Sequence, residues 1–418
     1  MPSETVTIEG HVIDSFTLPR VLEEIVELGG SYEIVDFDVG ARHENPSFAR
    51  VNVTAASDEE LAALIERLGH LGANQEVTGD AALVAADVAG SFPSGFYSTT
   101  NLETEVRIGG RWAPVRHPEM DCGIVVEDGS ARTIPMAEVE VGMPIVMAGG
   151  GLKVTPPQKP RDQNAPQAFE FMAYEVSSEK PKALLLERVA EHMSSVKAAG
   201  RRILWVVGPA LVHTGSGPDL CALIRAGYVN ALFAGNGVAA HDVESNMFGT
   251  SLGVYLDHGA PAEHGHEHHI RALNEIRRHG SFKAAIEAGV FSGGLVYHLV
   301  TTGADYLFGG SVRDDGPMPE TEPDMTRVQA RLRQLIWGRN GDDLVGYCII
   351  AGTMLHGIAT GNCLPASVPL ACIDINQATV TKLMDRGSFQ SLGIITDVGL
   401  FLNALAQRLC PEELATRP

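Results

Sequence analysis

The sequence lacks any segment suited to cross a bilayer, because it contains no run of about 18 uncharged apolar residues. Its first residues, MPSETVTIEG, lack the basic, apolar and small-residue succession of a secretory signal. Basic residues are scarce: 31 lysines and arginines stand against 52 aspartates and glutamates, a formal net charge of −21. That charge repels phosphate backbones and anionic lipids, so we expect no nucleic-acid or membrane partner. Without a signal succession or a long apolar run, we expect a cytoplasmic protein.

Cysteine is also sparse, and its placement excludes a disulfide framework. The six cysteines lie in apolar segments without CxxC spacing, which is typical of buried thiols in a reducing compartment. They are Cys122, Cys221, Cys348, Cys363, Cys372 and Cys410.

The chain has 418 residues, of which 44% are hydrophobic and 20% charged, which is the composition of a globular protein with more than one domain. Residues 1–97 alternate strand and helix patterns in the order β-α-β-β-α-β, which predicts a ferredoxin-like α+β domain. The expected elements are strand 5–14, helix 17–30, strands 31–40 and 47–55, helix 57–73 with Ser57 or Asp58 as its N-cap, and strand 81–87.

The helical period disappears after this region. Residues 98–182 carry short strands separated by glycine and proline, so we expect a small β-rich domain. The proline-rich stretch 153–166 predicts an extended connection.

Residues 183–418 alternate apolar strands with helical segments, which predicts a Rossmann-like, doubly wound parallel sheet with helices on both faces. The expected strands cover 202–208, 230–235, 304–310, 344–352, 369–375 and 392–398.

Ligands of such sheets bind beyond the carboxyl ends of the strands, so the polar residues that follow each apolar run are the candidates for a site. Helix amino termini suit a pyrophosphate and carboxylates suit ribose hydroxyls, which is what a dinucleotide needs. The residues are Asn236, Asp314, Asp315, Thr353, His356, Asp374 and Asp397.

The glycine fingerprint for dinucleotides is incomplete. After the strand 202–208, the run from Gly215 to Leu220 has leucine where the third glycine belongs. The loop alone therefore fits a structural turn as well as a nucleotide site.

Histidines gather at His258, His264, His266, His268 and His269 among acidic residues. Imidazole and carboxylate suit a transition metal, but the spacing lacks a metalloprotease helix motif, and a polar, exposed helix start is the favoured interpretation. We expect no metal. Two further motifs each allow two interpretations. Residues 177–180 form either a helix cap or the end of a strand. Asp121 and Cys122 either pack beside a strand or include a nucleophile.

Long ordered blocks resemble the archaeal-type ornithine cyclodeaminases that carry the LOR/SDH conserved region, and the resemblance covers essentially the whole chain. The blocks are PEMDCGIVV, FEFMAYEVSSEKP, GPALVHTGSGPDL, NALFAGNGVAAHDVESNMFGTSLG, VRDDGPMPE, TMLHGIATGN and VTKLMDRGSFQSLGIITDVGLFL.

The resemblance implies a lyase that uses NAD in a domain similar to that of deoxyhypusine synthase, which would explain the incomplete fingerprint. We also expect a homo-oligomer, a dimer or tetramer. The nucleotide contacts that it implies are Asn230, Ala231, Asp315, Gly352, Thr353, Met354, Leu355, His356, Asp374, Asp397 and Val398.

The implied reaction oxidises Cα of L-ornithine to an imine, which the δ-amine attacks with loss of ammonia, and reduction of the ring then gives L-proline. This chemistry needs a base for the α-ammonium group. The candidates are Asp315, Glu179 and His356, and Asp315 is preferred because it lies in a glycine-flanked loop after a predicted strand.

Three other interpretations remain. An amino-acid dehydrogenase of the saccharopine or lysine-ketoglutarate reductase type would change net NADH, whereas a cyclodeaminase would not. A transferase like deoxyhypusine synthase would need a protein substrate, for which the sequence gives no sign. The ferredoxin-like domain could also serve regulation or assembly.

Overall fold

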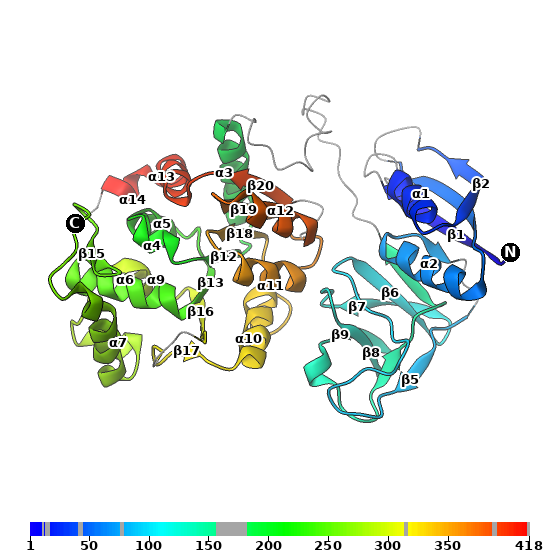
Figure 1. Cartoon of the computed structure of the whole chain (residues 1–418), viewed down its shortest axis with the longest axis horizontal. Coiled ribbons are helices and arrows are strands. Elements are labelled where there is room, and N and C mark those ends of the chain that lie inside the picture. The colour runs from blue at the N-terminus through cyan, green and yellow to red at the C-terminus, as the bar shows by residue number, and fades with distance from the viewer. Residues whose placement is uncertain are drawn as a thin grey trace. The chain divides into compact units, whose positions relative to one another are not determined.

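The computed structural model describes residues 1–10, 12, 17–40, 45–75, 79–155, 182–312, 317–386 and 391–415. The chain divides into two compact units (Figure 1). The first comprises Met1–Glu170 with Asn362–Ser367, and the second comprises Phe171–Gly361 with Val368–Pro418.

The first unit begins with the predicted ferredoxin-like fold. Its four-stranded sheet has the order β2-β3-β1-β4, and the pairs are antiparallel. Ser57 is the N-cap of the second helix and accepts a hydrogen bond from the backbone N–H of Glu60, as capping requires. The elements are β1 (Ser3–Gly10), α1 (Thr17–Glu27), β2 (Ser31–Asp38), β3 (Ser47–Thr54), α2 (Asp58–His70) and β4 (Asn74–Gln75).

The prediction of strand 81–87 as the last strand of this sheet is wrong. The fourth strand is the short β4, whereas β5 (Leu83–Ala85) pairs with β10 (Pro144–Val146) in the second sheet. An alternating pattern identifies a strand but not the sheet that it joins. The domain boundaries at 97/98 and 182/183 stay predictions.

A second, β-rich sheet of seven strands completes the first unit, in the order β11-β6-β7-β9-β8-β10-β5. Lys153, Val154 and Thr155 belong to its strand β11, so the extended connection does not begin at 153 as expected. The remaining elements are β6 (Glu103–Ile108), β7 (Arg111–Arg116), β8 (Gly123–Glu127), β9 (Ser130–Ile134), η1 (Met136–Glu138), β10 (Pro144–Val146) and β11 (Leu152–Thr155).

The second unit is built on a parallel sheet, and all six predicted strands are confirmed. Its order is β17-β16-β13-β12-β18-β19-β20, and every neighbouring pair is parallel. The strands are β12 (Ile203–Val207), β13 (Ala231–Gly235), β16 (Asp305–Gly309), β17 (Thr321–Glu322), β18 (Tyr347–Ala351), β19 (Leu370–Asp374) and β20 (Ser391–Ile395).

Helices cover both faces of this sheet, which explains why all five residues of β12 and of β18 are buried. Figure 1 shows α5, α6 and α9 on one side of the strands and α10, α11 and α12 on the other. The helices are α3 (Lys182–Ala198), α4 (Ala210–His213), α5 (Gly217–Arg225), α6 (Asn236–Phe248), α7 (His268–His279), α8 (Phe282–Glu287), α9 (Gly294–Thr302), α10 (Met325–Trp337), α11 (Leu355–Cys363), α12 (Gln377–Arg386), α13 (Val398–Leu409) and α14 (Pro411–Ala415), with η3 (Gly265–Glu267) and the hairpin β14 (Thr250–Ser251) and β15 (Val254–Tyr255).

Strand order reverses between β12 and β18. The chain adds β13 and β16 on one side of β12, and then β18, β19 and β20 on the other. This reversal leaves a switch point beyond the carboxyl ends of β12 and β18, where such sheets bind their ligands.

Each described helix is too short or too polar to span the apolar layer of a bilayer. All six cysteines are free and buried, which confirms the expectation of buried thiols.

Candidate functional site

The switch point is a place of close backbone approach between two glycines. The N–H of Gly208 donates to the carbonyl of Ala351 at 3.0 Å. A Cβ atom on Gly208 would lie 1.9 Å from the carbonyl oxygen of Gly352, and Gly352 itself has a φ of +63°. A side chain at Gly208 would prevent this approach, and the left-handed φ of Gly352 favours glycine. The carboxyl ends of β12 and β18 thus carry no side chain at Gly208 and Gly352, and we call this pair the glycine floor.

The helix α11 begins directly after this floor, at Leu355. Its first-turn N–H groups have no partner within the helix and carry the positive end of the helix dipole, which suits an anionic group. The predicted contacts Gly352, Thr353 and Met354 form the link between β18 and α11. A pyrophosphate placed at this turn would meet backbone donors rather than side chains.

His356 reaches from α11 over the end of β12 toward β13. Its ring centroid lies 4.8 Å from that of Phe233 in an edge-on contact, and its Cε1 would lie 3.1 Å from a Cβ on Gly235. Burial lowers the pKa of His356, and its Nδ1 lies 3.4 Å from the hydroxyl oxygen of Thr353. His356 is therefore a neutral imidazole at neutral pH, able to accept or donate one proton.

Two predicted carboxylates follow the last two strands. Asp374 ends β19 and accepts a hydrogen bond from the N–H of Asn376 at 2.8 Å. Asp397 is the N-cap of α13 and accepts from the N–H of Leu400 at 2.9 Å, and the adjoining Val398 is buried. Both lie at the carboxyl edge, so they are available for the hydroxyls of a ligand.

The same edge exposes large apolar side chains beside these polar groups. Leu355 is 75% exposed, while Ile375 and Leu400 are each 72% exposed. Each follows a different strand, β18, β19 or β20, by at most five residues. Apolar faces next to backbone donors and carboxylates fit the flat rings, pyrophosphate and riboses of a dinucleotide.

Asn230 and Ala231, which the resemblance implies as nucleotide contacts, lie at the start of β13 and not at this edge. Asn230 precedes β13, and its Oδ1 accepts from the N–H of Ile203 at 2.9 Å, at the start of β12. The N–H of Asp305 likewise donates to the carbonyl of Asn230 at 3.0 Å. These bonds tie together the amino ends of three parallel strands, which is the edge opposite to the site.

Asn236 instead follows β13 at the carboxyl edge. Its buried Oδ1 accepts from the N–H of Met318 at 2.9 Å and from the hydroxyl of Thr321 at 2.8 Å. Asn236 therefore fixes the segment that begins at Met318, three residues after Asp315 in the chain. Asp314, Asp315, Glu179 and the rest of the 177–180 motif lie outside the described residues.

The incomplete glycine fingerprint packs as a structural turn. The hydroxyl oxygens of Thr214 and Ser216 lie 2.5 Å apart, and a Cβ on Gly399 would lie 2.7 Å from the Oγ of Ser216. The turn before α5 thus rests against the first turn of α13.

A histidine and carboxylate network, which the sequence analysis missed, lies on α4, α6 and the hairpin after α6. The Nδ1 of His241 lies 2.8 Å from the fully buried carboxylate of Glu244, which also accepts from the hydroxyl of Thr250 at 3.0 Å and the N–H of Gly253 at 2.9 Å. Burial acts to raise the pKa of Glu244, but these hydrogen bonds outweigh it and the pKa is lowered. An ionised carboxylate that orients an imidazole is the arrangement of a general base.

His213 of α4 joins this network. Its ring centroid lies 4.8 Å from that of His241, and its Nδ1 lies 2.7 Å from the hydroxyl of Ser251. Burial, followed by the neighbouring His241, lowers the pKa of His213. These residues all fall in blocks that carried the family resemblance, which was the available signal for them.

The histidine run before α7 divides between structural contacts and solvent. His268 stacks on Phe248, and its Nδ1 lies 2.8 Å from the hydroxyl of Thr250, whereas the side chains of His264 and His266 are more than two-thirds exposed. Within the described ranges, no group of three or more histidine, cysteine, aspartate or glutamate residues is arranged to hold a metal ion.

Asp121 and Cys122 have structural contacts in the first unit. Asp121 adopts a φ of +61°, and its Oδ2 accepts from the side chain of Asn362 at 2.9 Å. Cys122 is buried, with its Sγ 3.4 Å from the carboxylate of Glu119. These contacts favour packing over a nucleophile for Cys122.

Comparison with known families covers nearly the whole chain. Residues 187–405 match "Arginine dihydrolase ArgZ-like, C-terminal, Rossmann fold", and residues 103–186 match the first region of the same C-terminal part. Residues 3–102 match "LOR/SDH bifunctional enzyme conserved region".

Individual relatives agree with these matches. The ornithine cyclodeaminase of Methanothermobacter thermautotrophicus is 43% identical over 98% of this chain and 98% of its own length. The apo crystal structure of ArgZ, an arginine dihydrolase from the ornithine-ammonia cycle in cyanobacteria, matches with a TM-score of 0.83 and 34% identity, over 98% of this chain and 58% of that one. The ternary complex of AgrE with ornithine and NAD+ matches with a TM-score of 0.53 and 37% identity, over 98% of this chain and 58% of that one.

Proposed function

The chain belongs to the family of ornithine cyclodeaminases that carry the LOR/SDH conserved region, and from this premise we propose that it converts L-ornithine to L-proline and ammonia with bound NAD. The observation that carries the proposal is the glycine floor at Gly208 and Gly352, followed at once by the amino terminus of α11. This is the place in an open parallel sheet where a dinucleotide is held.

Bound NAD supplies a hydride acceptor for Cα of ornithine and the donor that reduces the ring. The chain must then hold the cofactor throughout turnover. We assign the pyrophosphate to the backbone of 352–356 and the riboses to Asp374 and Asp397. The exposed side chains of Leu355 and Ile375 would cover apolar ring surface and displace water from it.

A base must remove a proton from the α-ammonium group before Cα is oxidised. Asp315 remains our first candidate from the sequence, with Glu179 and His356 as the others. The His241 and Glu244 pair is a further candidate, because Glu244 fixes the orientation of the imidazole. The δ-amine then attacks Cα within the same molecule. The enzyme therefore only has to position the δ-amine, and no second molecule needs to bind.

We propose a cytoplasmic location, because six free, buried cysteines fit a reducing compartment.

We also propose that the protein is a homo-oligomer. The edge strand β2 has all eight residues exposed, including Ile34 at 43%, Val35 at 56% and Phe37 at 42%. An edge strand with apolar residues on both faces is prone to pair with another chain. Sedimentation should therefore give a mass of at least two chains, and a strictly monomeric protein at micromolar concentration would contradict this.

The function is tested by incubating the purified protein with L-ornithine and a catalytic amount of NAD. We expect proline and ammonia in equal amounts, without a lasting change of absorbance at the nicotinamide band. NADH that accumulates in proportion to product would identify a dehydrogenase instead, and the absence of both products would overturn the proposal.

A further inference from the structure

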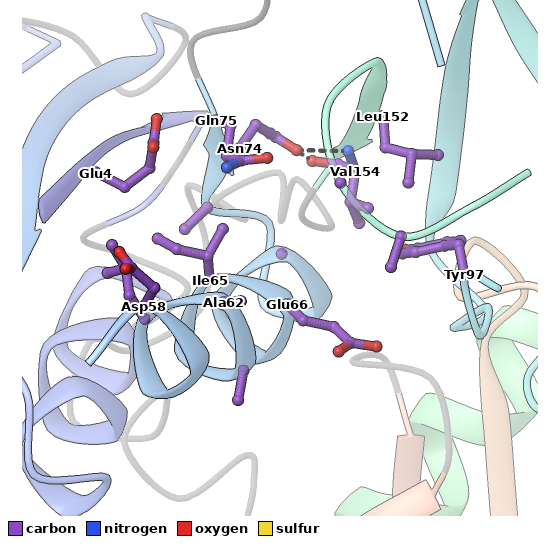
Figure 2. A pocket seen from close by; sticks show the side chains of 16 residues that line it. Glu4, Asp58, Ala62, Ile65, Glu66, Asn74, Gln75, Tyr97, Leu152 and Val154 are labelled. Atoms are coloured by element: carbon purple, nitrogen blue, oxygen red, sulfur yellow. Dashed lines mark hydrogen bonds between the residues drawn. The ribbon is translucent and has the colours of Figure 1, made fainter. Parts of the chain in front are cut away.

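The first unit contains a cavity of about 450 Å³ between α2 and the strands β4 and β11 (Figure 2). This volume lies in the range of small-molecule sites. None of the residues assigned above to NAD or to catalysis lines it.

The cavity wall is fixed by a pair of hydrogen bonds between two strands. The side chain of Asn74 on β4 donates to the carbonyl of Val154 at 2.9 Å and accepts from the N–H of Val154 at 2.7 Å. Apolar side chains of α2 and β11, Leu61, Ile65 and Leu152, form the floor. The two sheets of the unit therefore meet in a defined geometry at this cavity rather than through a loose contact.

The hydroxyl of Tyr97 is a buried polar group without a hydrogen-bond partner among the described residues. Tyr97 is only 4% exposed, lines the cavity and points toward its interior (Figure 2). Burial, followed by the negative charge of Glu66, raises the pKa of Tyr97 far above its usual value, so the phenol stays protonated. A buried hydroxyl without a partner costs free energy, and a ligand that bonds to it would recover that cost.

The charged residues that line the cavity are all acidic. They are Glu4, Asp58 and Glu66, and the lining includes no lysine, arginine or histidine. An anionic ligand is therefore disfavoured, and a cation would meet complementary charge.

We propose that this cavity binds a small organic cation, an alkyl ammonium or guanidinium group on a short methylene chain. The chain lies on the apolar floor of Leu61, Ile65 and Leu152. The cationic head donates to the carboxylate of Glu66 and to the hydroxyl oxygen of Tyr97, which gives that oxygen its missing partner.

The test is a calorimetric titration of the full-length protein with n-butylguanidinium and n-butylammonium chloride, with n-butanol as the neutral probe. An exposed charge pair contributes about fivefold in affinity. We therefore expect the cations to bind, and butanol to bind at least about fivefold more weakly. Equal binding of butanol, or no binding of either cation up to saturating concentration, would overturn the proposal.

Three variants locate the binding. Glu66→Gln and Tyr97→Phe should each weaken binding of n-butylguanidinium by about fivefold, since each removes one polar contact. Glu59→Gln, on the same helix but outside the lining, should leave it unchanged. Tyr97→Phe removes a hydroxyl that has no partner among the described residues, so this variant should fold normally. Its cation affinity therefore tests the assignment even if Glu66→Gln does not fold. Cation affinities of Glu66→Gln and Tyr97→Phe that equal the unmodified value would contradict the assignment.

Discussion

Replacing Asp315 with asparagine should reduce proline formation by at least about 100-fold and leave NAD binding intact. The amide has the same shape as the carboxylate but cannot accept the proton of the α-ammonium group. Asp315 lies in the connection between β16 and β17, after a strand that ends at the carboxyl edge. Turnover measured as proline released, together with calorimetric titration of NAD, separates the loss of a base from the loss of cofactor.

The matched control is Asp342→Asn, which removes the same charge from an exposed position before the amino end of β18. We expect it to retain turnover within about threefold of the unmodified enzyme, a change of about 0.6 kcal/mol in the barrier. Near-normal turnover of Asp315→Asn would remove Asp315 from the mechanism and leave Glu179, His356 and the His241 and Glu244 pair as candidates.

Replacing Gly208 with valine should abolish measurable NAD binding and lower the stability of the second unit. The added Cβ would lie 1.9 Å from the carbonyl oxygen of Gly352 and 2.8 Å from its carbonyl carbon. A clash with backbone cannot be relieved by a rotamer change, so β12 and β18 must separate at their carboxyl ends. Overpacking of this kind costs about 3 kcal/mol, and the floor of the site moves with the strands.

Gly208→Ala should have a smaller effect in the same direction, because it adds only the Cβ. The control is Gly150→Ala in the first unit, where a Cβ meets nothing within 4 Å. We expect that variant to bind NAD and unfold like the unmodified protein. Unchanged NAD affinity in Gly208→Val would show that the cofactor does not lie over this floor.

The parallel sheet was predictable because its strands are buried on both faces. The resulting apolar runs, such as RILWVVG and LVGYCIIAG, are visible in the sequence alone. The strands β4 and β17 have only two residues each and leave no such signal. The strand at 83–85 was recognised but assigned to the wrong sheet, because pairing partners depend on tertiary structure.

The site was predictable only in part. The sequence shows which residues lie near a strand end, but not which residues from distant segments come into contact. Residues at or shortly after the end of a strand, such as Asp374 and His356, lie at the carboxyl edge as expected. Asn230 precedes its strand, so the parallel topology puts it at the opposite edge. His213 and His241 come from separate helices, and their contact arises only on folding.

The central claim is that the carboxyl edge of the parallel sheet holds NAD, and a crystal structure at saturating NAD tests it most directly. The account predicts the pyrophosphate at the amino terminus of α11, over Gly208 and Gly352, with the riboses near Asp374 and Asp397. A structure in which this edge stays empty while NAD is bound elsewhere, or not at all, would contradict the account.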